Sequence, residues 1–560
     1  MKKQISVLII FISVLFFMIA CDDNKKEEVN DSDTEETPDD EGDCPVTVPV
    51  EHDGEEITAA TDWSGIHHII GTLWVKAPLT MDKCTTILMD PNSRISVSDG
   101  GSIKVNGTAD NIVPFLSAKA VPAAGDWNGI EIKKTASSGN SFKFTSFSHA
   151  GKSSYGAIWV DGEAEVAIDD CAFISIDNYG VMFENGAKIE SFTGNKFASI
   201  GTYPVLVGAN AVPALSPVET DDATDRIFVQ AEDVEDAGTW KNLSIGYEVE
   251  YLFIHKPVTI EQGNTLFMRE NAHVDLADGG SMIAVGTEIA PIVFTSAKEG
   301  PGAGDWKQIT VRDTASNDTK FEYVNFEFGG GDDYGVIWVD PEAAVSIDNC
   351  KFSDIQGTGL IFDNGAEIGS FTNNEFVNIE TYPVTIGANA VPALSPIVTD
   401  DTTDRIYVKA EDIDDAGTWK NLSIGYEIEY LYLHKPIIIE AGTTLFMREN
   451  GQINTENGGA LTLDGTETAH VTITSYKDAP AEGDWKQIEI YDSGSDANVF
   501  NYADIMYGGS DDYGQLWVQS GAKITLNNVV FSNGQTCDLF NENGEALITD
   551  TGSTYVTCPE

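Results

Sequence analysis

The sequence predicts an all-β protein built as a parallel β-helix, a solenoid of stacked coils, because it carries two nested periodicities. The longer one is marked by the tripeptide Gly-Asp-Trp, whose tryptophans Trp127, Trp306 and Trp485 follow one another at a constant step of 179 in sequence number. Self-similarity at a fixed step indicates one structural unit repeated in tandem. The repeat therefore bears on the fold before any residue is considered for chemistry.

The shorter period is about 24 residues, a length typical of solenoid repeats, and lies inside the longer one. Tyr155, Tyr179 and Tyr203 follow one another at this step, each before a glycine or proline, and each opens a short apolar segment. Asparagine, aspartate and glycine turn signals separate these segments, and no helical periodicity lies nearby. Short strands and turns at this step are typical of one coil of a parallel β-helix.

Alternation within the apolar segments predicts which side chains face the core. Every second residue from each tyrosine is mostly bulky and apolar, and this set includes Trp159, Trp338 and Trp517. Because successive side chains of a strand point to opposite faces, we expect these three tryptophans to lie inside the solenoid. Cys171 and Cys350 occupy equivalent positions in two repeats and are expected to be inward and reduced.

The long repeat divides most of the chain into three units, 46–239, 240–418 and a truncated unit 419–560 that ends in a C-terminal cap. A β-helix needs its open ends covered, because bare strand edges promote aggregation. Cysteines near the two ends predict one disulfide at each, suited to an oxidising compartment. The expected pairs are Cys44–Cys84 and Cys537–Cys558.

Residues 1–20 have the layout of a secretory signal, with a short basic start and an apolar run. A small residue before Cys21 makes the segment resemble a bacterial lipoprotein signal, which implies lipidation of Cys21 and a membrane anchor. The alternative is an ordinary signal with an accidental cysteine. Residues 21–45 are strongly acidic and predict a disordered tether. We therefore expect a bacterial outer-membrane or cell-surface location, facing the exterior or the periplasm.

The net charge of −58 argues against nucleic acid or an anionic membrane surface as a partner, since both need positive charge. It is compatible with a neutral polysaccharide, divalent cations, a basic protein, or simple solubility outside the cell.

The stretch from Gly286 through Pro291 to Trp306 resembles the right-handed parallel β-helix repeats of bacterial surface and secreted proteins, the pectate-lyase-like superfold. The resemblance covers about residues 60–540 and implies a right-handed parallel β-helix. This fold is shared by polysaccharide lyases, glycoside hydrolases, adhesins and proteins without known activity, so it does not select among them.

No catalytic residue is predicted. Arg226 and Arg405 are repeat mates, and the motifs of polygalacturonase-like enzymes are missing from the sequence. His255 and His434 also repeat, but Lys76 stands in their place in the first unit. An active site normally breaks repeat symmetry, and no unit-specific cluster does so.

The predicted ligand-binding residues follow each Gly-Asp-Trp on one strand face, where an aromatic ring beside amides and carboxylates suits a sugar. The alternative is that each tryptophan of the tripeptide packs under a neighbouring loop. The candidates are Trp127, Glu131, Trp306, Gln308, Arg312, Trp485, Gln487, Glu489 and Tyr491.

Repeated acidic turns are candidates for calcium, which takes several oxygen ligands. The alternative is that these turns are simply solvated. No cofactor other than calcium is indicated. The aspartates are Asp221, Asp222, Asp225, Asp332, Asp333, Asp400, Asp401, Asp404, Asp511 and Asp512.

Two to three copies of one surface favour multivalent capture of an extended, repetitive ligand. The sequence therefore favours a non-enzymatic surface binding or adhesion scaffold, most simply for a polysaccharide or a surface protein. A polysaccharide lyase or glycoside hydrolase is the first alternative, and a purely structural envelope protein is the second.

Overall fold

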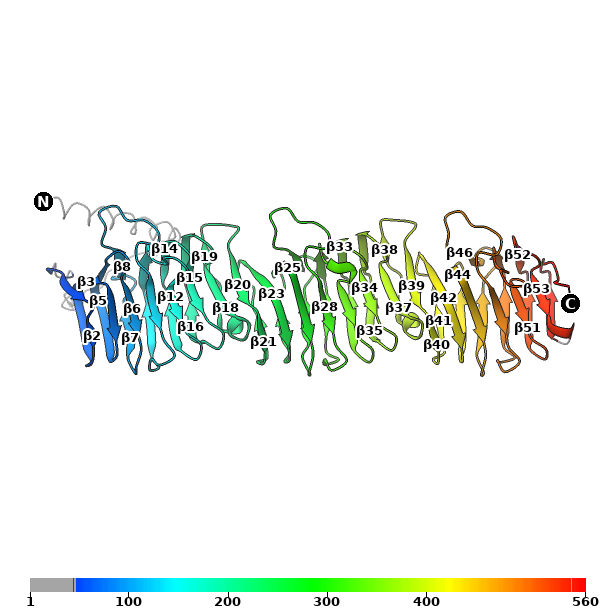
Figure 1. Cartoon of the computed structure of the whole chain (residues 1–560), viewed down its shortest axis with the longest axis horizontal. Coiled ribbons are helices and arrows are strands. Elements are labelled where there is room, and N and C mark those ends of the chain that lie inside the picture. Colours follow the sequence, from blue (N-terminus) through cyan, green and yellow to red (C-terminus); the bar gives the residue numbers. More distant parts are fainter. Residues whose placement is uncertain (1–43, 45–46, 545, 560) are drawn as a thin grey trace, which may run out of the picture. The chain divides into compact units, whose positions relative to one another are not determined.

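The computed structural model describes residues 44, 47–544 and 546–559. The signal segment 1–20, Cys21 and nearly all of the tether 21–45 lie outside the described residues. The described part of the chain divides into two compact units, one of residues up to 182 with 194–202 and the other of 183–193 with residues from 203 onward. Within each unit, parallel strands stack coil upon coil, as the all-β prediction requires (Figure 1).

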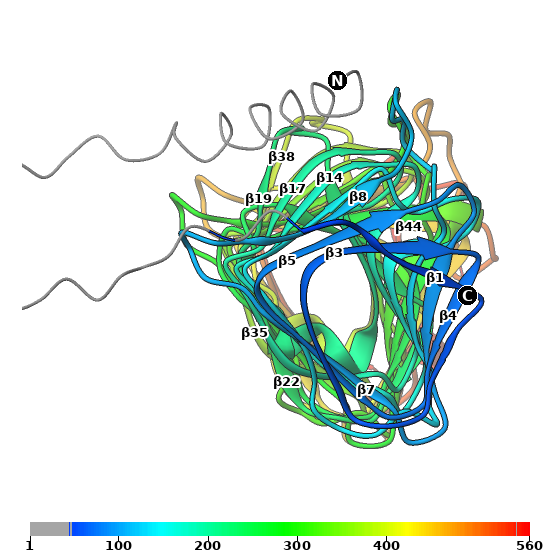
Figure 2. The same ribbon diagram turned by 90° about the vertical axis from the view of Figure 1, so that its left-hand side faces the viewer.

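The coils of the first unit are built from strands of a first, a second and a third sheet. The first half of β5 (Pro78–Met89) pairs with β7 (Ser102–Asn106) of the third sheet, and its second half pairs with β8 (Val113–Ser117) of the first. In the end-on view, β3, β4 and β7 border the coil on different sides (Figure 2). The first sheet contains β1 (Val50–Asp53), β3 (Thr61–Ile70), β5 (Pro78–Met89), β8 (Val113–Ser117), β11 (Thr145–Ser148), β14 (Ala172–Ile176) and β17 (Lys196–Ile200). The second contains β2 (Glu56–Ile57), β4 (Thr72–Val75), β6 (Arg94–Val97), β9 (Gly129–Ile132), β12 (Gly156–Val160) and β15 (Tyr179–Phe183). The third contains β7 (Ser102–Asn106), β10 (Asn140–Lys143) and β13 (Glu165–Asp169).

The second unit has the same three sheets, and its four longest strands bend so that each half joins a different sheet. These bent strands are β23 (Gly246–Ile254), β25 (Thr265–Leu276), β42 (Gly425–Leu433) and β44 (Thr444–Thr455). The first sheet also contains β19 (Glu219–Thr220), β27 (Ile292–Ser296), β30 (Val324–Glu327), β33 (Lys351–Ile355), β36 (Glu375–Ile379), β38 (Val398–Thr399), β46 (Val471–Ser475), β49 (Ala503–Met506) and β52 (Val530–Ser532). The second also contains β18 (Val205–Gly208), β20 (Arg226–Gln230), β21 (Glu232–Val234), β28 (Gln308–Val311), β31 (Ile337–Val339), β34 (Leu360–Phe362), β37 (Val384–Gly387), β39 (Arg405–Lys409), β40 (Glu411–Ile413), β47 (Gln487–Ile490), β50 (Leu516–Val518) and β53 (Leu539–Asn541).

The third sheet of this unit forms two stacks, and four short 3-10 helices complete the described elements. The strands of the two stacks are β22 (Gly238–Trp240), β24 (Val258–Ile260), β26 (Met282–Val285), β29 (Lys320–Glu322), β32 (Ala344–Asp348) and β35 (Glu367–Thr372), and β41 (Gly417–Trp419), β43 (Pro436–Glu440), β45 (Ala460–Asp464), β48 (Asn498–Asn501), β51 (Lys523–Asn527) and β54 (Leu547–Thr551). The strand β16 (Lys188–Thr193) belongs to neither stack. The 3-10 helices are η2 (Ala209–Ala214), η3 (Gly331–Asp333), η4 (Ala388–Ala393) and η5 (Glu542–Gly544).

A ladder of phenylalanines shows how the coils pack. Phe294, Phe326, Phe352 and Phe376 face the interior from successive first-sheet strands, with ring centroids 5.3, 5.0 and 4.9 Å apart. These separations match the ~4.8 Å spacing of neighbouring strands, so each ring stacks on the next. Phe352 pairs with Phe376 across a coil of the predicted length, whereas Phe294 pairs with Phe326 across a longer coil. The extra segment of that coil forms a loop that leaves the stack unchanged.

Buried asparagines fasten the turns between sheets. Asn374 accepts a hydrogen bond from the Cys350 amide at 3.0 Å and donates to the Ile347 carbonyl at 2.9 Å. Asn195 does the same for Cys171 in the first unit. Backbone groups that the turns would leave unpaired are thereby satisfied.

At the junction of two repeats, the second sheet passes into the first. In the second unit β37 pairs with β39, and β39 pairs with the first half of β42. That half then continues through β44 into β46, which lies in the first sheet. The hydrogen-bonded stack is thus continuous through this junction, although it begins in the second sheet and ends in the first.

The cysteines are arranged as predicted from the sequence. Cys44 is bonded to Cys84, and Cys537 is bonded to Cys558. Cys171 and Cys350 are free and buried, and burial raises the pKa of each thiol to about 12.

The inward orientation predicted for Trp159, Trp338 and Trp517 is wrong. Leu360 stacks on Ile337, so the coil between them is shorter by a single residue than the predicted period. A shift of one residue turns every side chain of a strand to the other face. Ile337 and Val339 are therefore buried, while Trp338 faces outward and is half-buried.

Replacing Phe352 with alanine tests the stack. We expect Phe352→Ala to lower the free energy of unfolding by about 3–5 kcal/mol, because it leaves a cavity between two rings. The unfolding midpoint in denaturant measures this effect. Val285→Ala, an exposed change on the third sheet, is the control and should have little effect. Equal midpoints for the two variants would contradict the ladder.

Candidate functional site

The outward face of the second sheet carries three equivalent rows of side chains, one in each long repeat. Each row crosses four neighbouring strands and has an aromatic residue at both ends. The strand registers align the members of each row side by side. Row 1, in the first unit, is Trp74, Ser96, Glu131 and Trp159. Rows 2 and 3, in the second unit, are Phe253, Asp275, Thr310 and Trp338, and Tyr432, Asn454, Glu489 and Trp517.

A tyrosine accompanies the last tryptophan of each row. Tyr513 stacks on Trp517 with ring centroids 4.0 Å apart, and Tyr334 lies 5.4 Å from Trp338. Tyr155 and Trp159 form the same pair at 5.1 Å. The two tyrosines of the second unit are partly exposed, Tyr334 by 42% and Tyr513 by 38%. Each pair therefore presents aromatic surface to solvent beside polar groups.

The tryptophans of the Gly-Asp-Trp tripeptides are not on this surface, contrary to the sequence prediction. Trp127, Trp306 and Trp485 are fully buried, and each indole N–H donates to a backbone carbonyl at 2.8–2.9 Å. Trp306 precedes β28 and follows Gly304, which has a φ of +81°. The alternation of the strand does not extend back through such a turn, so the outward parity assigned to Trp306 does not hold.

The aspartate of the tripeptide fastens the preceding loop. Asp305 accepts hydrogen bonds from the Ser296 hydroxyl at 2.6 Å, the Lys298 ammonium at 2.8 Å and the Gly302 amide at 2.9 Å. Burial alone would raise its pKa, but these donors outweigh burial and hold the pKa below the usual value. Asp126 and Asp484 have the same partners in their own repeats. The tripeptide is therefore a structural motif.

Row 1 contains a cation beside its acid and a hollow. Glu131 accepts hydrogen bonds from Ser96 at 3.1 Å and from the Lys133 ammonium at 2.7 Å. A hollow borders Arg94, Glu131 and Trp159 at Gly129. A side chain at Gly129 would collide with the Gly156 carbonyl, and the corresponding residues in the other repeats are glutamines. Gly129 therefore breaks the repeat symmetry at this position.

In row 2 an arginine balances the negative charge of the acid. The Arg312 guanidinium donates to Asp275 at 2.9 Å and lies 3.6 Å from Asp340. Gln308 donates to Thr310 at 2.7 Å, and the Trp338 indole donates to Asp363 at 2.8 Å.

Row 3 has an acid among neutral groups. Glu489 is 5% exposed and accepts a hydrogen bond from the Gln519 amide at 2.8 Å. Burial raises its pKa, although Gln519, Tyr491 and Gln487 hydrogen-bond to the carboxylate. Gln487 is also buried, so Gln487 and Glu489 have the predicted outward parity on β47 but little exposed surface.

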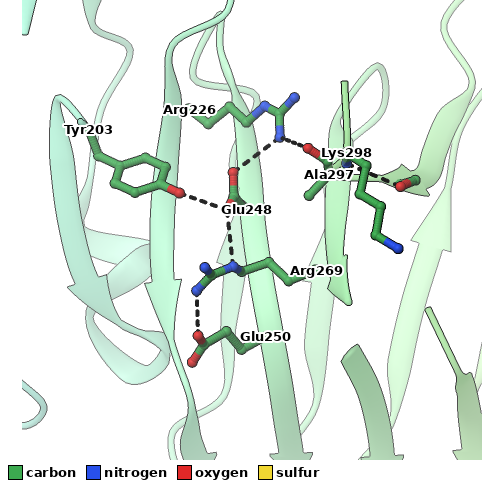
Figure 3. Close-up of polar contacts among 8 residues, drawn as sticks. Tyr203, Arg226, Glu248, Glu250, Arg269, Ala297 and Lys298 are labelled. Atoms are coloured by element: carbon green, nitrogen blue, oxygen red, sulfur yellow. Dashed lines mark hydrogen bonds and ion pairs between the residues drawn. The ribbon is translucent and has the colours of Figure 1, made fainter. Parts of the chain in front are cut away.

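A second polar cluster lies on the same unit, where repeats meet. Figure 3 shows Glu248 between Arg226 and Arg269, with the Tyr203 hydroxyl donating to the same carboxylate at 2.7 Å. Arg226 also donates to the Ala297 carbonyl at 3.1 Å. This cluster links strands of successive coils.

The cluster recurs at the next repeat junction as Tyr382, Arg405, Glu427 and Arg448. Burial and the Glu427 carboxylate raise the pKa of Tyr382 to about 12, so this tyrosine stays protonated at neutral pH. Because every acid and base is engaged, the cluster suits cross-linking of coils better than proton transfer.

The predicted calcium turns are spread along the surface. Asp222 accepts hydrogen bonds from the Thr224 amide and hydroxyl, and Asp401 has the same role with Thr403. Burial raises the pKa of Asp225 to about 6. Across the described residues, no three His, Cys, Asp or Glu side chains form a group able to hold a metal ion. Clustering of the kind expected for calcium is thus not formed there, and the Asp333 side chain is outside the described part.

Sequence reasoning missed the residues that complete the rows. Trp74, Asp275 and Asn454 carry no motif, and Trp338 was assigned to the core. The sequence does contain one usable signal. If Ile337 and Val339 are aligned with Leu360 and Phe362 as the inward pairs, Trp338 between them must face outward.

Comparison with known proteins supports the fold. A model of the pectate-lyase like beta helix domain matches residues 59–170, which contain row 1. No curated protein and no solved structure matches the chain significantly. The described part of the chain has no helix long and apolar enough to cross a membrane. The chain therefore contains a region similar to pectate-lyase-like β-helices within a parallel β-solenoid.

The loop aspartates give the fold a defined acid sensitivity. Since the folded pKa of Asp305 lies below its ordinary value of 3.8, its stabilisation is present above about pH 4 and is lost as the pH falls through the folded pKa. We expect Asp305→Asn to lower stability at pH 7 by about 1–3 kcal/mol and to weaken this acid dependence. Denaturant unfolding at several pH values measures both. Glu299→Gln on the same exposed loop is the control, and an equal response of the two variants would contradict the assigned role.

Proposed function

We propose that the protein is a non-enzymatic binding scaffold that holds an extended glycan against the outward face of the second sheet. The observation that carries this proposal is the repeated pairing of a partly exposed tyrosine with a half-buried tryptophan beside polar groups. Aromatic faces pack against the C–H faces of sugar rings, and nearby amides and carboxylates orient the hydroxyls.

Repetition supports an extended ligand. Rows 2 and 3 belong to one compact unit and occupy equivalent places in successive repeats. Two linked sites raise the apparent affinity for a polymer that engages both, without any new contact. A glycan with repeating units fits this arrangement, and its binding requires no cofactor.

The charges of rows 1 and 2 also favour binding over catalysis. Glu131 is paired with Lys133, and Asp275 is paired with Arg312. Each carboxylate is already engaged by a cation of its own repeat, which leaves it less free to act on a substrate. The expected surface location rests on the N-terminal signal and on Cys21, and belongs to the same proposal.

An enzyme acting on polysaccharide, a lyase or glycoside hydrolase, is the second candidate, because row 1 has a hollow at Gly129, where the other two repeats have glutamine. Arg94 and Glu131 border that hollow. Release of reducing ends or unsaturated products from a polysaccharide, lost in Glu131→Gln, would support the enzyme and contradict the scaffold.

Removing the aromatic pairs tests the scaffold. We expect Trp338→Ala and Trp517→Ala each to weaken binding to an immobilised polysaccharide. The double variant should weaken binding at least about tenfold, because one polymer engages both sites and the binding free energies of the two sites add. A glycan array, read with and without calcium, identifies the ligand first.

Ile438→Ala, an exposed change on the third sheet, is the matched control. Thermal unfolding by circular dichroism checks that each variant is folded. Unchanged binding by the folded double variant would contradict this face as the binding surface.

A further inference from the structure

Row 3 differs from the other rows at the position that supplies a cation to the acid of the row. Lys133 in row 1 and Arg312 in row 2 each come shortly after the row member on the same strand face, and each donates to a carboxylate. The equivalent residue beside row 3 is Tyr491, one repeat after Arg312. The acid of row 3 therefore lacks the internal cation that its counterparts have.

The partners that the structure gives Glu489 are all neutral. They are the Gln519 amide at 2.8 Å, the Tyr491 hydroxyl and the Gln487 amide. A buried carboxylate is stable as an anion only when charges or several donors compensate the lost hydration. Its raised pKa shows that these neutral donors compensate it incompletely.

Other polar atoms around this acid are buried without a hydrogen-bond partner. They are Asn454 Oδ1, Gln487 Oε1 and the Trp517 indole nitrogen. In row 2 the Trp338 indole does have a partner, Asp363, although Gln308 Oε1 is unpartnered there. Each such atom costs about 1–3 kcal/mol when left unpaired. Row 3 thus has unused acceptors and a donor next to an uncompensated anion.

Aromatic rings frame these polar groups. Tyr432 stands at one end of the row and Trp517 at the other, three coils apart along the register. The spacing of parallel strands makes that distance about 14 Å, enough for a sugar ring and its neighbours. Tyr513 extends the surface beyond Trp517.

We propose that row 3 selects an amino sugar with a free ammonium group, which pairs with Glu489 while a sugar ring stacks on the Tyr513–Trp517 pair. This inference rests on the proposed glycan-binding function and adds the chemical class of the ligand. The ammonium supplies the positive charge and the donors that row 3 lacks, and the net charge of −58 attracts a cationic ligand to the surface.

Binding of two matched trisaccharides to the full chain tests this inference. The probes are the β-1,4-linked trimer of glucosamine and its N-acetylated counterpart, compared by titration calorimetry at about 0.15 M salt, where long-range attraction is screened. We expect the glucosamine trimer to bind at least about tenfold more tightly, and Glu489→Gln to remove that preference.

Three variants keep the test specific. Glu489→Gln removes one negative charge from a protein with a net charge of −58, so a tenfold loss reflects a local contact. Glu367→Gln, the same change at an exposed position of the third sheet, is the matched control and should leave the preference intact. Tyr491→Lys places a cation where rows 1 and 2 have one and should abolish the preference without removing the acid.

The outcomes separate this inference from the proposed function. Equal affinity for both trimers, or a preference unchanged in Glu489→Gln and Tyr491→Lys, would overturn the amino-sugar assignment while leaving glycan binding in place. Binding of neither trimer nor any polysaccharide on the array would overturn both.

Discussion

Parallel stacking in register is the constraint on which the structure depends. Each strand of a coil hydrogen-bonds to the strand below, so equivalent side chains lie about 4.8 Å apart in straight rows. Inside, this spacing places Phe326, Phe352 and Phe376 in ring contact. Outside, it places Asn454, Glu489 and Trp517 side by side. The core and the candidate binding surface are therefore two faces of the same hydrogen-bonded register.

Loops are free to vary because they leave that register unchanged. The coil between Phe294 and Phe326 is longer than the coil between Phe352 and Phe376, yet the ring separations differ by only a few tenths of an ångström. Asp305 holds the extra segment against the stack. At the repeat junctions, where the stack passes from the second sheet to the first, two arginines pair with Glu248 and two with Glu427 and so link neighbouring coils. These structural clusters recur nearly unchanged, whereas the rows differ in charge from one repeat to the next.

Sequence periodicity predicted the solenoid and the buried free cysteines, and the positions of the other cysteines predicted the two disulfides. It failed for the tryptophans, and the reason is geometric. The coil between Ile337 and Leu360 is shorter by a single residue than the assumed period, and this difference reverses the face of Trp338. The prediction that Trp306 faces outward failed for a different reason. Trp306 lies in a turn after Gly304, so the alternation of the strand does not extend to it. Periods identify coils, but a side chain's face depends on the exact register, which only the pairing of strands reveals.

The chemistry of the rows was beyond sequence reasoning for a related reason. Glu489 was named as a candidate, but its neutral surroundings come from residues on three different coils. A crystal structure of the chain with a bound oligosaccharide tests most directly whether the second sheet binds sugar. We expect sugar rings against the Tyr334–Trp338 or Tyr513–Trp517 pairs on this sheet. Sugar bound on the first or third sheet, or Trp338 and Trp517 turned into the core, would contradict it.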